Sequence, residues 1–135
     1  MPLYVFDTNH VTNRSSGMTR FLACGPGDVA VVSVAVQGVL KGRLAALATA
    51  RKPVDFVHGC ALLAGSLIAI SQLPVLPFDT PAGREYQSIR ATLPKSGNQD
   101  MRIAAVAIVN NRTLPTQNIR DFLGIANLRV ADWSV

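Results

Sequence analysis

The chain has 135 residues, of which 49% are hydrophobic and 16% are charged. This length and composition exclude a disordered chain and leave no room for two full-sized domains, so we expect a single domain over 1–135. A formal net charge of +5 suits an anionic partner such as RNA or DNA, although many basic proteins bind neither.

The first predicted strand, 3–6, runs directly into Asp7, Thr8 and Asn9. A short polar side chain at this point caps a following helix well. Alternatively, the strand delivers a carboxylate to a site at the carboxyl edge of a parallel sheet, where open α/β folds bind ligands. This stretch alone leaves both interpretations open.

The rest of the chain alternates between short apolar runs and segments with helical spacing of apolar residues. Thr80 is the expected N-cap of one helix, with Pro81 at its first position. This alternation predicts an α/β fold with a parallel sheet and right-handed crossovers. The expected helices are 18–24, 34–50, 54–72, 80–93 and 99–110, and the further strands are 29–33, 73–77, 113–116 and 128–130.

The longest nearly apolar stretch, 56–70, lies within one of these predicted helices. It is shorter than the roughly 20 residues of a membrane-spanning helix, and it contains His58 and Ser66. We therefore predict a buried helix, part of which serves as an oligomer face, and no membrane association. Cys24 and Cys60 have no metal-ligand spacing, so we expect two reduced core thiols in a cytoplasmic protein.

Three carboxylates fall where a parallel sheet would present its carboxyl edge. Asp7 ends the first strand, Asp100 opens an apolar helix, and Asp121 follows the strand at 113–116. Each also has a structural explanation: Asp100, for example, complements the dipole of its helix. Clustered carboxylates repel one another unless a cation neutralises them, and hard cations such as Mg²⁺ prefer oxygen ligands. Such a metal site is well suited to phosphodiester hydrolysis.

The ordered set of motifs resembles PIN-domain ribonucleases, and most closely the VapC-type toxins of bacterial toxin–antitoxin pairs. The resemblance covers nearly the whole chain. It implies a PIN-like three-layer fold, in which a central parallel five-stranded sheet is flanked by helices. The segments that carry it are "YVFDTNHVT", "GNQDMRIAAVAIVNNRTL", "PTQNIRDF" and "LRVADW".

The same resemblance implies a metal-dependent endoribonuclease. Asp7, Asp100 and Asp121 would be its catalytic and metal-binding acids, with Mg²⁺ or Mn²⁺ as the cofactor. The implied partners are a cognate antitoxin protein, an RNA substrate and a second copy of the chain in a homodimer.

Five further residues are candidates for supporting roles. Asn9, Thr116 and Asn118 would orient an acid, a water molecule or a phosphate, although a local turn explains Asn9 equally well. Arg102 and Arg120 sit beside predicted acids and would hold a substrate phosphate through paired hydrogen bonds. A surface ion pair is the alternative for each arginine.

One motif departs from the family pattern. After the second strand the family usually has Thr-x-x-Glu, then three residues and a Gly, and that glutamate is the second acid of the site. Aligning Gly42 with the glycine puts Gly38 in the place of the glutamate, and a slip of one residue would put the neutral Gln37 there. The chain is therefore either a nuclease crippled at Gly38, by natural loss or by an inactivating substitution, or a catalytically silent PIN domain that binds protein or RNA.

Overall fold

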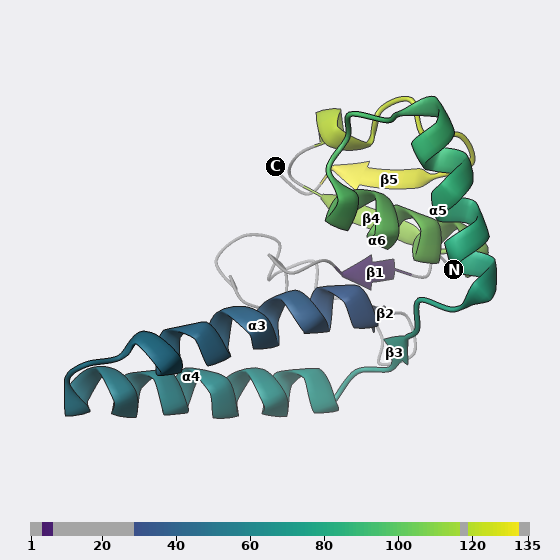
Figure 1. Ribbon diagram of the computed structural model, residues 1–135. Helices are drawn as coiled ribbons and strands as arrows, with labels where there is room; N and C mark the ends of the chain where they lie inside the picture. Colours follow the sequence, from purple (N-terminus) through teal and green to yellow (C-terminus); the bar gives the residue numbers. More distant parts are fainter. Residues whose placement is uncertain (1–3, 7–28, 117–118, 133–135) are drawn as a thin grey trace.

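The computed structural model describes residues 4–6, 29–116 and 119–132, and it has an α/β architecture (Figure 1). The strands are β1 (Tyr4–Phe6), β2 (Val29–Val32), β3 (Val75–Leu76), β4 (Thr113–Thr116) and β5 (Arg129–Asp132). The helices are α3 (Ser33–Thr49), α4 (Pro53–Ser71), α5 (Thr80–Thr92) and α6 (Asn98–Val109), with a short 3₁₀ helix, η1 (Ile119–Phe122). The helix expected at 18–24 lies outside the described residues.

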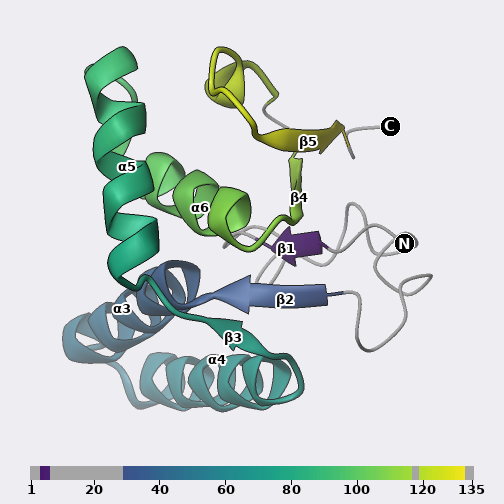
Figure 2. The ribbon, with the colours of Figure 1, turned by 90° about the vertical axis from the view of Figure 1, so that its right-hand side faces the viewer.

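The strands form one five-stranded sheet in the order β3-β2-β1-β4-β5, and every pair is parallel (Figure 2). The predicted sheet is therefore confirmed. From β1 the chain builds outward through β2 and β3, and then it returns to the other side of β1 with β4 and β5. The order of strands thus switches between β1 and β4, which is where open parallel sheets bind ligands beyond the carboxyl ends of their strands.

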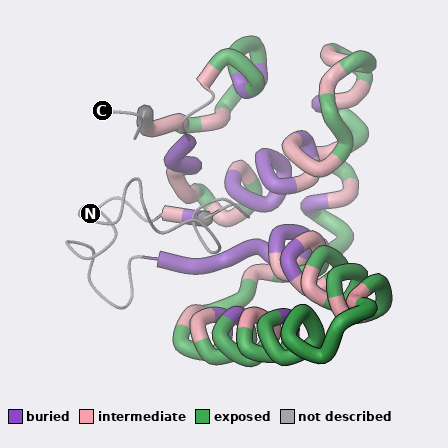
Figure 3. Tube along the Cα trace, turned by 90° about the vertical axis from the view of Figure 1, so that its left-hand side faces the viewer, coloured by how far each residue is buried: buried purple, intermediate pink, exposed green. Residues whose placement is uncertain are grey.

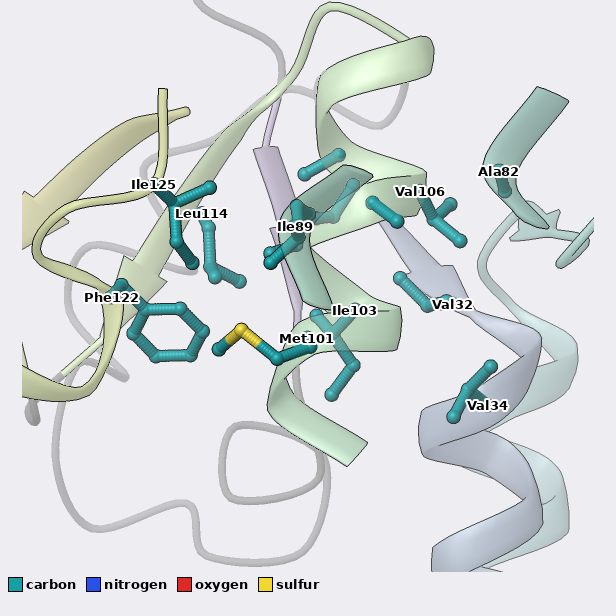
Figure 4. Close-up of a cluster of buried hydrophobic side chains, with 14 of the residues drawn as sticks. Val32, Val34, Ala82, Ile89, Met101, Ile103, Val106, Leu114, Phe122 and Ile125 are labelled. Atoms are coloured by element: carbon teal, nitrogen blue, oxygen red, sulfur yellow. The ribbon is translucent and has the colours of Figure 1, made fainter. Parts of the chain in front are cut away.

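Two hydrophobic clusters lie on opposite faces of this sheet, because successive side chains of a strand point to opposite faces. On β2, Val29 and Val31 belong to a smaller cluster with Val39 of α3 and Ile70 of α4. Val32 belongs to the larger cluster, which α5, α6 and the first turn of α3 cover (Figure 4). The layered arrangement that the motifs imply is therefore present.

Helices α3 and α4 form a hairpin that projects from the body of the domain (Figure 1). The inner side of α4 lies against α3. Arg43 Nε donates a hydrogen bond to Ser66 Oγ at 3.1 Å, and a Cβ added at Gly59 would lie 2.9 Å from Leu47 Cδ2. The glycine thus permits close approach of the two helices.

Most of α4 is exposed, so the prediction of a buried helix is wrong (Figure 3). Its buried residues are Gly59, Ser66 and Ile70, and Cys60 is an exposed thiol rather than a core one. Apolar composition alone does not distinguish a helix inside the core from one with a single packed side. By length and composition only, α4 is apolar enough to cross a membrane. We define the outer face of α4 by its large exposed side chains, Val54, Phe56, Val57, Leu67 and Ile68.

The start of α5 differs by one residue from the expectation. Asp79, and not Thr80, is the N-cap, and its Oδ1 accepts the Ala82 backbone N–H at 3.2 Å. Thr80 and Pro81 occupy the first helical positions, where the missing N–H of proline is tolerated.

Candidate active site at the carboxyl edge of the sheet

Asp100 is the third residue of α6 and lies in its first turn. One of its carboxylate oxygens, Oδ2, is 3.8 Å from the point where a Cβ on Gly97, the N-cap residue, would lie. The carboxylate therefore lies close to the amino end of the helix, where free N–H groups and the helix dipole favour a negative charge. The helix itself is anchored by Met101 and Ile103, which are almost completely buried.

Side-chain hydrogen bonds to two other helices, α3 and α5, hold this first turn. Gln99 Nε2 donates to the Val34 carbonyl of α3 at 2.7 Å, and Tyr86 Oη of α5 donates to Asn98 Oδ1 at 3.1 Å. The α6 residues in these two hydrogen bonds, Gln99 and Asn98, lie within two positions of Asp100. The turn that carries this acid is therefore fixed from two flanks.

Arg102 lies away from Asp100 around α6. Two residues correspond to a rotation of about 200° around an α-helix. The guanidinium of Arg102 lies over the Tyr86 ring, 5.5 Å from its centroid, and this ring in turn meets Phe78 edge-on. A cation–π contact with α5 is thus the interaction that the structure gives Arg102. Its binding of a substrate phosphate stays a prediction.

Gly38 lies on the flank of α3 that faces α6. It comes one turn after Val34, which corresponds to about 40° around the helix. Val34 and Ala35 both pack in the larger hydrophobic cluster together with residues of α6. Position 38 is therefore close to the part of α3 that Gln99 contacts, but glycine offers no side-chain oxygen there.

The third predicted acid, Asp121, is exposed in η1, and its neighbour Arg120 is exposed as well. Phe122, the next residue, is 5% exposed and packs in the larger cluster beside Met101 (Figure 4). Because Met101 follows Asp100 directly, this packing places η1 next to the first turn of α6. Thr116 ends β4 and is 3% exposed.

Three of the predicted site residues, Asp7, Asn9 and Asn118, lie outside the described residues, and their roles stay predictions. Within 4–6, 29–116 and 119–132, no three His, Cys, Asp or Glu side chains gather into a group that could hold a metal ion. The described part of the edge thus contributes Asp100 from α6 and Asp121 from η1.

Sequence reasoning missed Gln99 and Tyr86. Gln99 and its partner Val34 are 65 positions apart in the chain, and no local pattern encodes such a contact. The one available signal was position: Gln99 directly precedes a predicted acid inside a recognised motif.

No protein-family model matches the chain. Among curated proteins, Ribonuclease VapC2 of Rickettsia felis is 36% identical over 70 residues, which are 49% of this chain and 52% of the relative. A tRNA(fMet)-specific endonuclease VapC of Salmonella typhimurium is 37% identical over 68 residues, 47% of this chain and 52% of the relative. The match thus spans about half the length of each of these curated relatives.

The likeness in fold extends over nearly the whole chain. A chain of the DNA-bound VapBC structure from Salmonella typhimurium is similar with a TM-score of 0.76 and 25% identity, over 98% of this chain and 99% of that one. A chain of Rickettsia felis VapBC2, bound to a DNA fragment from its promoter, gives a TM-score of 0.73 and 23% identity, over 97% and 98%. The predicted resemblance to VapC-type proteins and the predicted fold are therefore confirmed.

Proposed function

We propose that the chain is an endoribonuclease toxin of the VapC type whose catalysis is weakened at Gly38. Two relatives, each matched over about half of its length, are named ribonuclease and endonuclease, which supports RNA cleavage as the reaction class. The observation that carries the proposal is the position of Asp100. This acid lies in the first turn of α6, beside the 3₁₀ helix that carries Asp121.

The proposed cofactor is Mg²⁺ or Mn²⁺, held by Asp7, Asp100 and Asp121. Hard cations of this kind prefer oxygen ligands, with waters and substrate phosphates completing their coordination, so this donor set fits the ion. When bound, the metal would supply an activated water and neutralise charge on the phosphate. Thr116 and Asn118 are the proposed groups that orient this water and the phosphate.

Gly38 is the proposed cause of weak activity. With glycine in place of a glutamate, the site has one fewer charge and one fewer oxygen ligand, so the cation is held less firmly. Glycine also costs about 1 kcal/mol relative to alanine inside a helix. This position of α3 is therefore favourable for neither stability nor catalysis, which supports the loss of a functional side chain here.

RNA cleavage in Mg²⁺ or Mn²⁺ tests this assignment with three proteins: the parent, Gly38→Glu and the double variant Gly38→Glu/Asp100→Asn. We expect the single variant to cleave RNA at least about a hundredfold faster than the parent, because a missing ligand group costs orders of magnitude. The double variant should return to the parent's level. Equal cleavage by parent and Gly38→Glu, whether high or absent, would show that the missing acid is misplaced.

The proposed protein partner is an antitoxin that covers the outer face of α4. The similar solved structures from two organisms are of VapBC assemblies, and in this chain five large apolar side chains of α4 are exposed. Asp55 is the only Asp, Glu, Lys or Arg in this described helix. An uncharged apolar surface of this kind marks a protein interaction site.

A charge placed on this face should weaken binding of the antitoxin. We expect Ile68→Glu to reduce affinity at least about thirtyfold, because a buried interface position of this kind is worth 2 kcal/mol or more. Ala91→Glu, on the exposed side of α5, is the matched control and should bind normally. Equal binding by the two variants would move the antitoxin site elsewhere.

A second candidate function, a silent PIN domain that binds protein or RNA, is favoured by Gly38 itself. The same apolar face of α4 serves this function equally well. The two functions differ in the response to Gly38→Glu, since a silent domain would gain no RNA cleavage from the new carboxylate.

A further inference from the structure

We infer that Gln99 is a positioning residue that fixes the turn at position 38 of α3 relative to Asp100 of α6, so that a carboxylate at position 38 would reach the cation that Asp100 binds. This inference rests on the proposed function, because it assumes that Asp100 binds the metal. It goes further by naming what fixes the two helices relative to each other.

The side-chain hydrogen bond of Gln99 links the first turn of α6 to the first turn of α3. Its Nε2 donates to the Val34 carbonyl at 2.7 Å in a partly buried position. In an α-helix the carbonyl of residue i accepts the N–H of residue i+4, so the Val34 carbonyl is directed at Gly38. Gln99 is also the residue immediately before Asp100. A single amide side chain therefore joins the turn that carries Asp100 to the turn that carries position 38.

The first turn of α3 is itself a fixed anchor. Ser33 Oγ accepts the Phe78 backbone N–H at 3.2 Å, which ties the start of α3 to the segment between β3 and α5. Val34 is 6% exposed and packs in the larger cluster. Gln99 thus attaches α6 to the first turn of α3, which is itself held by a hydrogen bond and by hydrophobic packing.

The hydrogen bond of Tyr86, on the other flank of the first turn of α6, connects α6 to a different helix. Tyr86 Oη donates to Asn98 Oδ1, and this bond joins α6 to α5 and not to α3. Two ligands on separate helices bind one cation at full strength only when the distance between them is fixed. Residues that orient metal ligands in this way commonly raise metal affinity by about 10–100-fold.

The test is the affinity for Mn²⁺ alone, measured by electron paramagnetic resonance without RNA or antitoxin. The proteins are the parent, Gly38→Glu, Gln99→Met and the double variant Gly38→Glu/Gln99→Met. Methionine keeps the length of the side chain and removes the donor. Asn110→Ala in the Gly38→Glu chain is the control, because it removes a side-chain hydrogen bond at the opposite end of α6, between Asn110 Nδ2 and the Val106 carbonyl.

We expect Gly38→Glu to bind Mn²⁺ about tenfold more tightly than the parent, since it adds a charged oxygen ligand. Gln99→Met should abolish most of this gain and leave the parent's affinity within about twofold. Asn110→Ala should retain the gain. This pattern would mean that the effect of Gln99 depends on the ligand at position 38, which a general loosening of the fold does not predict.

Three results would overturn the inference. If the double variant keeps the full gain, Gln99 does not position the ligands, although the proposed metal site stands. If Gln99→Met weakens the parent and Gly38→Glu by the same factor, Gln99 supports only Asp100 or the fold. If Gly38→Glu brings no gain, position 38 is not part of the site, and the proposed function fails with the inference. Should Gln99→Met melt more than about 5 °C below the parent, Gln99→Leu takes its place, and the same three results apply.

Discussion

The thioether of Met101 lies beside the ring of Phe122 in the core, and each residue directly follows an acid of the candidate site (Figure 4). This contact joins the first turn of α6 to η1. The relative position of Asp100 and Asp121 is thus set by hydrophobic packing one residue further along the chain.

Loss of the Phe122 ring should destabilise the domain. We expect Phe122→Ala to lower the free energy of unfolding by about 3–5 kcal/mol, because it removes a large buried side chain and leaves a cavity. Leu123→Ala is the control: this neighbour is 64% exposed, and its replacement should cost less than about 0.5 kcal/mol. Urea unfolding gives both values. A similar cost for both variants would contradict the packing described for η1.

The N-cap of α5 can be tested by two adjacent substitutions. Asp79→Ala should lower the free energy of unfolding by about 1 kcal/mol, because the Ala82 N–H loses its acceptor. Thr80→Ala should change it by less than about 0.5 kcal/mol. Thermal melting of the two variants compares them directly, and the reverse order would restore the assignment made from the sequence.

Two glycines of α4 should respond differently to alanine. At Gly65 an added Cβ meets nothing within 4 Å, so Gly65→Ala should stabilise the helix by up to about 1 kcal/mol. At Gly59 the Cβ would lie 2.9 Å from Leu47 Cδ2, so the leucine must turn aside and much of that gain is lost. We therefore expect Gly65→Ala to be the more stable variant by about 1 kcal/mol in urea unfolding. Equal stability would mean that α3 and α4 are less closely packed.

The thiol of Cys60 reports whether α4 is covered in solution. In a Cys24→Ser chain, we expect N-ethylmaleimide to modify Cys60 at a rate within about tenfold of that in the urea-unfolded chain, because the residue is exposed. The predicted homodimer can be examined in the same experiment. A rate that falls as protein concentration rises would place the second copy over α4, and a constant rate would place the dimer contact elsewhere.

Local pattern was enough to predict most of the fold. The strand expected at 113–116 has those bounds, and the helix expected at 34–50 begins and ends one residue earlier, at Ser33 and Thr49. These elements follow from apolar periodicity, which is a property of neighbouring residues. The strand expected at 73–77 shrinks to Val75–Leu76, because backbone pairing in the sheet, and not composition, decides where a strand ends.

The candidate site was only partly predictable. The position of Asp100 at the start of α6 follows from its motif, and the structure agrees. The hydrogen bond between Gln99 and Val34 depends on how two helices that are distant in sequence pack against each other. The exposure of the outer face of α4 depends on which of its side chains the rest of the domain covers. Neither is a property of a short stretch of sequence.

The brevity of β3 limits how these molecules can associate. As the last strand on its side of the sheet it has only two residues, Val75 and Leu76, and it lies between Pro74 and Pro77. Prolines have no N–H to donate, so a strand from another molecule would find few backbone partners along this edge. The sheet therefore resists continuation across this edge into a neighbour, and assembly on this side is left to helical surfaces, which protects an apolar protein of this composition from edge-to-edge aggregation.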